Sequence, residues 1–184
     1  MNKTDIRIRK ILKTTKTIAC VGASPNKLRP SYFVLRYLHL RKFKILPVNP
    51  NFKGQTLFGQ RFLGSISEIK PSTNVDMLNI FRKSETVLPI VIEGLSSLIG
   101  LKTIWMQIGV KNEEARKLAI SSGLEVIENR CPKIEHQRIF GELRMSGFNT
   151  GIISSKLVII LVPQNMTRLF HQESKFRVHL SQVT

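Results

Sequence analysis

An apolar run that ends at a glycine and leads into a helix constrains this sequence more than any other feature. The run Thr17–Val21 is followed by Gly22, a short polar loop that contains Ser24, and an amphipathic segment that begins at Pro30. Buried parallel strands are nearly continuous in apolar residues, and proline suits the first turn of a helix. A helix that starts directly after such a strand can hold phosphate at its N-terminus, and Ser24 can add a hydroxyl or a helix-capping oxygen. The stretch therefore predicts a nucleotide or a similar ligand.

The alternation of apolar runs and amphipathic segments continues along the chain to about residue 143. Further strands are expected at 43–48, 75–81, 103–107 and 124–127. Helices are expected at 3–16, 30–41, 87–99, 112–121 and from 132 to about 143. Strands that alternate with helices pack as an open parallel sheet with right-handed crossovers. We therefore predict an α/β fold: an open parallel sheet of about five strands with helices on both faces.

Composition limits the class of protein. A chain of 184 residues with 42% hydrophobic residues is long and apolar enough for one domain with a core. No stretch approaches the roughly 20 apolar residues of a membrane span. The basic N-terminus has no apolar signal core, so we expect a cytoplasmic protein without a membrane partner. The two cysteines and four histidines have neither disulfide-scaffold nor metal-ligand spacing, so we expect no metal.

The formal net charge of +17 is unevenly distributed along the chain. No carboxylate occurs between Asp5 and Glu68, an interval that contains thirteen lysines and arginines. A field of this sign would concentrate anionic ligands, whether small phosphates, nucleic acid or a membrane surface. The alternative is a lineage-wide lysine bias with a solvated basic face. Charge by itself does not choose between these interpretations.

The usual dinucleotide is disfavoured by the residues around the first turn. Dinucleotide-binding domains need G-x-G-x-x-G there and an acid about 20 residues later for the ribose. After Gly22 come Ala23 and Ser24, and no further glycine follows until Gly54. Val-Asn-Pro (48–50) stands where the ribose acid belongs, and no Walker loop is present. NAD therefore fits poorly.

A phosphate-bearing ligand whose ribose tolerates positive charge fits the sequence better. Arg29, Lys44 and Lys53 are available to supply that charge. Coenzyme A (CoA) meets the requirement because its ribose carries a phosphate in addition to the pyrophosphate. NADP would fit the charge but still lacks its glycines.

Several blocks of sequence, in order, match one family. They are VGASPN (21–26), RPSY (29–32), PVNP (47–50), VD (75–76), FR (81–82), WMQIGV (105–110), RCPKIEH (130–136) and GFNTG (147–151). Over about residues 10–156 the sequence resembles the small stand-alone CoA-binding proteins, relatives of the nucleotide-binding domain of the succinyl-CoA synthetase alpha subunit. The resemblance implies a Rossmann-like fold that binds CoA or an acyl-CoA at the carboxyl ends of the strands. The family has no generally established reaction, so we assign neither a reaction nor a catalytic residue.

The resemblance also implies the residues of the site. Residues near the phosphates would be Gly22, Ala23, Ser24, Arg29 and Ser31. The adenosine would lie near Pro47, Asn49 and Pro50, and the rest of the ligand would contact Phe81, Arg82, Gln107 and Gly109. The CoA-binding domain would span residues 1–156, including the basic helix 3–16. Residues 157–184 depart from the family as an atypical C-terminal extension, in which 158–162 could form an edge strand.

Other functions stay open at this point. Cys131 lies beside Arg130 and Lys133 at a predicted helix start, where its pKa could be lowered. Such a thiol could serve a CoA- or acyl-CoA-dependent transferase or thiol-exchange enzyme. Glu135 and His136, however, are adjacent on a helix and diverge by about 100°, which suits ion pairing better than catalysis.

A second alternative is nucleic-acid binding by the basic N-terminal half. We favour it less, because the sequence lacks the clustered aromatic residues on which bases stack. The expected partner is therefore a small molecule, and a homodimer is left open.

Overall fold

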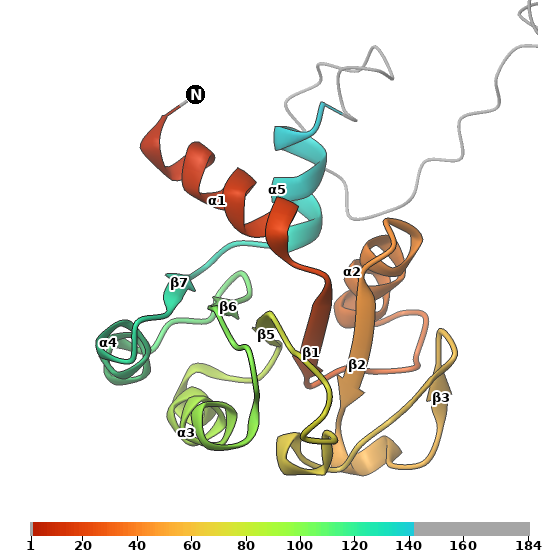
Figure 1. The fold of residues 1–184 in the computed structure, drawn as a ribbon. Coiled ribbons are helices and arrows are strands. Elements are labelled where there is room, and N and C mark those ends of the chain that lie inside the picture. The colour runs from red at the N-terminus through yellow and green to blue at the C-terminus, as the bar shows by residue number, and fades with distance from the viewer. Residues whose placement is uncertain (1, 142–184) are drawn as a thin grey trace, which may run out of the picture.

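The structure is a computed structural model that describes residues 2–141, and within them parallel strands form a five-stranded central sheet (Figure 1). The strands are β1 (Thr17–Val21), β2 (Lys44–Val48), β5 (Met77–Ile80), β6 (Thr103–Met106) and β7 (Glu125–Ile127). The helices are α1 (Lys3–Thr14), α2 (Pro30–Leu40), α3 (Val87–Ser97), α4 (Glu113–Ser121) and α5 (Pro132–Ile139). The predicted α/β fold is confirmed.

The order of the strands locates the functional edge of the sheet. The order is β2-β1-β5-β6-β7, with every neighbouring pair parallel. The chain moves outward from β1 to β2 and then returns to β5 on the other side of β1. Such a reversal creates a crevice beyond the carboxyl ends of β1 and β5, where open α/β sheets bind ligands.

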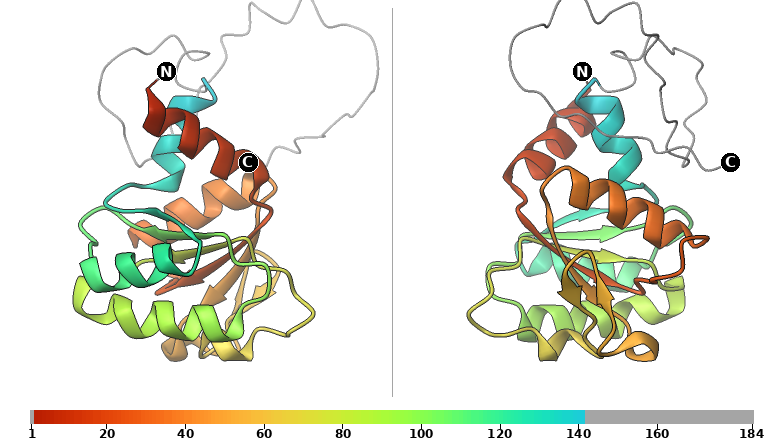
Figure 2. Two further views of the ribbon diagram at one scale, coloured as in Figure 1. Left: turned by 60° about the vertical axis from the view of Figure 1, so that its left-hand side comes forward. Right: turned by 90° about the vertical axis from the view of Figure 1, so that its right-hand side faces the viewer.

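Helices cover both faces of the sheet (Figure 2). Ile18 and Cys20 of β1 pack in one core cluster with residues of α1 and α2, and α5 contributes partly buried apolar residues there. Ala19 of β1 packs in the other cluster, with residues of α3 and α4. This alternation follows from the two-residue period of a strand, which sends successive side chains to opposite faces.

The boundaries of the elements differ slightly from the prediction. The first helix ends at Thr14 rather than residue 16, because Thr15 adopts an extended conformation while its amide still donates to Ile11 O. Strand β2 begins at Lys44, since Phe43 is buried in the core but is not paired in the sheet. The last helix ends at Ile139, and the predicted end near 143 lies outside the described residues.

A small hairpin is absent from the sequence-based prediction. Strands β3 (Thr56–Leu57) and β4 (Gln60–Arg61) pair antiparallel through Phe58 and Gly59, which both have positive φ. Positive φ at both central residues is typical of tight hairpin turns. Short 3-10 helices occur at Pro50–Phe52, Ile66–Glu68 and Ser84–Thr86. The sequence predicted only a glycine-containing loop around the hairpin, because two-residue strands show no apolar alternation.

Two further expectations concern membrane-spanning helices and the C-terminal residues. None of the helices formed by residues 2–141 is both long enough and apolar enough to cross a membrane. The proposed extension 157–184 and its expected strand 158–162 lie outside the part of the chain that the structure describes.

Candidate functional site

The turn after β1 depends on Gly22 for two reasons. Its φ of +83° lies in the left-handed region that favours glycine, and its amide donates to Val48 O at 2.9 Å. A Cβ at this position would lie 3.0 Å from Arg82 Cδ and 3.2 Å from Phe81 Cβ. The loop after β1 therefore packs directly on the segment after β5.

Ser24 does not cap α2. Its buried hydroxyl accepts a hydrogen bond from Asn26 N at 3.2 Å, which shapes the loop that precedes the helix. The N-cap residue of α2 is Arg29, and its side chain makes no capping hydrogen bond. The capping role expected for Ser24 is therefore wrong. The start of α2, where Pro30 follows Arg29, keeps the positive end of the helix dipole open toward this edge.

Asn49 joins the loops after β1 and β2. Its Nδ2 donates to Ala23 O at 2.8 Å, and its Oδ1 accepts from Asn51 N at 3.1 Å. The side chain is buried, so its polar atoms are engaged in holding backbone. Asn49 can therefore position this wall of a ligand site, whereas its proximity to an adenosine stays a prediction.

A hollow of about 250 Å³, here called the switch-point pocket, lies where the segments after β1, β2 and β5 meet the first turns of α3. Gly22, Asn49, Pro50 and Arg82, all predicted from the sequence, line it. Its wall also includes Gly64, Ser65, Thr86, Pro89, Ile90 and Glu93, which the sequence did not indicate. Topology brings these distant segments together, because the carboxyl ends of parallel strands share one edge.

The positive charge near this pocket differs from the prediction. Lys44 is the first residue of β2 and is paired in register with Thr17, so it lies at the amino edge, opposite the pocket. The expectation that Lys44 serves the ribose is therefore wrong. Lys53 lies near the rim, where its Nζ is 2.7 Å from Glu68 Oε1 and Glu68 Oε2 accepts from Gly64 N. Those two hydrogen bonds, from Lys53 first, lower the pKa of Glu68.

Gln107 and Gly109 lie farther along the same edge. Buried Gln107 donates from Nε2 to Asn79 Oδ1 at 3.2 Å, while Asn79 Nδ2 has no hydrogen-bond partner among residues 2–141. Gly109 N donates to Asn129 Oδ1 at 2.8 Å. The sequence analysis did not single out Asn79. Its signal was a polar residue flanked by apolar residues inside the expected strand 75–81.

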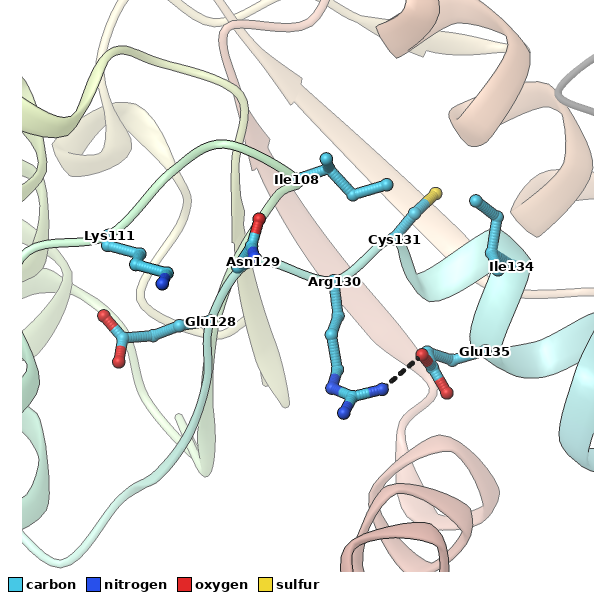
Figure 3. A pocket seen from close by; sticks show the side chains of 8 residues that line it. All are labelled: Ile108, Lys111, Glu128, Asn129, Arg130, Cys131, Ile134 and Glu135. Carbon is cyan, nitrogen blue, oxygen red and sulfur yellow. Dashed lines mark hydrogen bonds and ion pairs between the residues drawn. The ribbon is translucent and has the colours of Figure 1, made fainter. Parts of the chain in front are cut away.

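A hollow of about 440 Å³, here called the β6–β7 pocket, follows the ends of β6 and β7 (Figure 3). Ile108, Cys131 and Ile134 gather at one side of it, and Lys111 and Glu128 lie at the other. The remaining lining residues are Asn129, Arg130 and Glu135. None of the cofactor-binding residues predicted from the sequence lines this pocket, although Ile108 stands between Gln107 and Gly109. Cys131, the thiol of the alternative enzyme function, does line it.

Cys131 is not an activated thiol. Burial raises its pKa, and hydrogen bonds from the amides of Ile134 and Lys133 offset that effect only in part. The lowered pKa expected from the neighbouring cations is therefore wrong. Burial also lowers the pKa of Lys133.

Glu135 and His136 face different partners. Glu135 pairs with Arg130 at 2.8 Å and with Arg138 at 2.6 Å, which confirms its predicted ion-pairing role. His136 Nδ1 lies 2.9 Å from Tyr37 OH, and its ring stacks on Phe140. Within the described residues no group of three His, Cys, Asp or Glu could hold a metal ion.

Comparisons with known proteins place the fold and the site in context. A family model described as a CoA binding domain matches residues 16–137. The uncharacterized protein YneT of Bacillus subtilis (strain 168) is 32% identical over 135 residues, which are 73% of this chain and 96% of that protein. The solved structure of cell-free ID.343 from Thermus thermophilus is 35% identical with a TM-score of 0.69, and the match covers 76% of this chain and all (100%) of that one.

A larger enzyme contains a similar unit. The apo form of dinucleotide forming acetyl-coenzyme A synthetase 1 from Ca. Korarchaeum cryptofilum is 25% identical to this chain with a TM-score of 0.51. The match covers 62% of this chain but 26% of the synthetase. The likeness therefore concerns one part of that protein.

Proposed function

This chain belongs to the family of CoA-binding domains, and we propose that it binds CoA or an acyl-CoA along the carboxyl edge of its sheet. The observation that carries the proposal is the switch-point pocket, where Gly22, Asn49, Pro50 and Arg82 meet. No acid of the kind that binds an unphosphorylated ribose follows β2, which favours a ligand with a phosphorylated ribose. We assign no reaction to the protein, and we place it in the cytoplasm.

The proposed pose follows from the order of the strands. The nucleotide end occupies the switch-point pocket, and the pyrophosphate lies against loop 22–24 and the start of α2, near Arg29 and Ser31. The pantetheine arm then runs past Phe81, Gln107 and Gly109 toward β6 and β7. That path crosses about two strand spacings, or roughly 10 Å, a length that an extended pantetheine arm covers.

Arg82 is the principal charged contact in this proposal. It is exposed, it lines the switch-point pocket, and its stem would touch a Cβ at position 22. A guanidinium so close to the turn after β1 suits a phosphate, because arginine presents several donors to phosphate oxygens. Among the candidate cations for the ribose phosphate, Arg29 and Lys53 remain at this edge and Lys44 does not.

A thermal-shift panel with CoA, dephospho-CoA, NAD, NADP and ATP tests the function. CoA at about 100 times its dissociation constant should stabilise the folded protein by roughly 2.7 kcal/mol. We expect CoA to stabilise it most and dephospho-CoA less, since the latter lacks the ribose phosphate. Stabilisation by NAD but not by CoA would overturn the proposal. Equal effects of CoA and dephospho-CoA would remove the argument from ribose charge while leaving CoA binding intact.

We further propose that the CoA-binding unit spans residues 1–156 and that 157–184 is an extension outside it. The family match ends at residue 137, and the last described helix ends at Ile139. A truncated chain of residues 1–156 should therefore keep the CoA affinity of the full chain. Loss of CoA binding on truncation, with the remainder folded, would place part of the site in the extension.

A further inference from the structure

The β6–β7 pocket has an apolar side that the nucleotide end of a ligand would not use. Ile108, in the loop after β6, is 60% exposed and lines this pocket. Cys131 and Ile134, from the start of α5, lie next to it (Figure 3). An exposed isoleucine that faces a pocket gains stability when a ligand covers it.

The two carboxylates of this pocket, Glu128 and Glu135, are already paired. Glu135 is bound by Arg130 and Arg138, and Glu128 Oε2 lies 3.5 Å from Arg116 Nε. A cationic ligand would therefore have to compete with these arginines for the carboxylates. A neutral, apolar group meets no such competition on the side formed by Ile108, Cys131 and Ile134.

We propose that the β6–β7 pocket binds the acyl group of a short-chain acyl-CoA thioester, with Ile108, Cys131 and Ile134 as its apolar contacts. The inference rests on the proposed function, because CoA bound in the switch-point pocket directs its sulfur end along the edge toward β6 and β7. It goes further by assigning the ligand as the thioester rather than free CoA. Nothing in the pocket needs to react for this role.

The thiol of Cys131 is suited to such a contact. Burial raises its pKa, so the group is a neutral, weakly polar surface and not a thiolate. A thiolate beside a thioester would attack the carbonyl carbon, take the acyl group and release CoA. A buried neutral thiol leaves the thioester intact.

Isothermal titration calorimetry of the full chain with CoA, acetyl-CoA, propionyl-CoA and butyryl-CoA tests the inference. Each methylene that enters the pocket should increase the affinity by up to about fourfold. Ile108→Ser should flatten this dependence on chain length and leave the affinity for free CoA within about twofold. Ile134→Ser should act in the same direction. Ile120→Ser, at a 47% exposed isoleucine on α4 that does not line the pocket, is the matched control and should keep the dependence.

The outcomes separate the inference from the proposed function. Tight binding of CoA with no gain from the acyl chain would overturn the acyl pocket and leave CoA binding standing. Equal losses for CoA and every acyl-CoA in Ile108→Ser would also overturn it, because the residue would then contact the shared part of the ligand. Absence of CoA binding to the wild-type protein would overturn the proposed function itself. If Ile134→Ser unfolds, Ile108→Ser still tests the inference, because an exposed loop residue is not needed for folding.

Discussion

The two edges of the central sheet treat polar groups in opposite ways. At the amino edge, buried Asp76 accepts hydrogen bonds from Lys16 N at 2.9 Å, Thr17 N at 3.1 Å and Lys102 Nζ at 3.0 Å. Asn74 Nδ2 adds a further donor at 3.2 Å. The carboxylate is thereby surrounded by donors that hold the starts of β1 and β6. This edge is built for stability.

At the carboxyl edge, polar groups retain capacity for a ligand. Arg82 is exposed beside the switch-point pocket. The N-cap residue of α2, Arg29, makes no side-chain capping hydrogen bond. The difference teaches that the edge where donors are already used supports the fold, while the edge where they are spare can bind an anion.

Asp76→Asn should produce the largest effect, at the amino edge. The NH2 group that replaces one carboxylate oxygen cannot accept hydrogen bonds from the donors around it. The free energy of unfolding should therefore fall by about 3 kcal/mol. Urea unfolding measures the loss, and CoA affinity under folding conditions should be unchanged. A large loss of CoA affinity in a folded Asp76→Asn protein would contradict the division between the edges.

The difference in stability between the wild type and Asp76→Asn should depend on pH. Burial by itself would raise the pKa of Asp76, but hydrogen bonds from Thr17 N, Lys16 N and Lys102 outweigh it and lower the pKa below its usual value. The stability that this group contributes is therefore present above the unfolded-state pKa of about 3.9 and is lost as the pH falls through the lower folded-state value. Wild type and Asp76→Asn should differ most near neutral pH and converge in acid. A constant difference down to pH 2 would contradict the assignment.

Gly22→Ala should be the most damaging single-atom change at the carboxyl edge. The alanine would adopt a left-handed conformation and press on Arg82 and Phe81, at a cost of about 2 kcal/mol in the free energy of unfolding. Gly123→Ala is a matched control: its φ is +79°, and an added Cβ would meet no described atom within 4 Å. The free energy of unfolding of this control should fall by about 1 kcal/mol, and its CoA affinity should be unchanged. Equal losses of stability would show that the close approach to β5 is unimportant.

Asn49→Ala should affect stability and binding together. Removal of the side chain leaves Ala23 O and Asn51 N without their donor and acceptor, at a cost of about 1.5 kcal/mol. The loops after β1 and β2 would separate, so CoA affinity should also fall. Chemical unfolding and titration of CoA into the same preparation measure both. An unchanged affinity would mean that the position of these loops does not matter for the ligand.

Arg82→Ala should leave stability unchanged and weaken the affinity for CoA by about tenfold. A loss of this size corresponds to one hydrogen bond to a charged group. The neighbouring Lys83→Ala is the control, because Lys83 is also exposed but does not line the pocket. Titration calorimetry of both variants makes the comparison. Equal weakening by the two substitutions would indicate a diffuse charge effect and remove Arg82 from the site.

Local features of the sequence were sufficient for most of the fold and for one wall of the site. The strand Thr17–Val21, the turn at Gly22 and the helix start at Pro30 were predicted correctly, since each depends on near neighbours in the chain. The hairpin through Phe58 and Gly59 was missed, because its strands are too short to show a periodic pattern.

The misassigned residues share a different cause. Lys44 was placed near the ligand by its charge, but only the strand register shows that it begins β2 at the opposite edge. Cys131 was expected to be activated by its sequence neighbours, whereas burial among residues from other elements decides its pKa. Both errors concern where a side chain lies relative to distant segments.

The sequence by itself therefore determined the α/β class, the tight turn at Gly22 and the absence of a ribose acid after the second strand. These follow from patterns read along a few consecutive residues. Only the tertiary structure decided which cations remain beside the ligand edge, that Asn49 holds loop 22–24, and that Ile108, Cys131 and Ile134 form one apolar surface. The reason is physical: contacts and burial arise between segments that are distant in the sequence and meet only in the folded sheet.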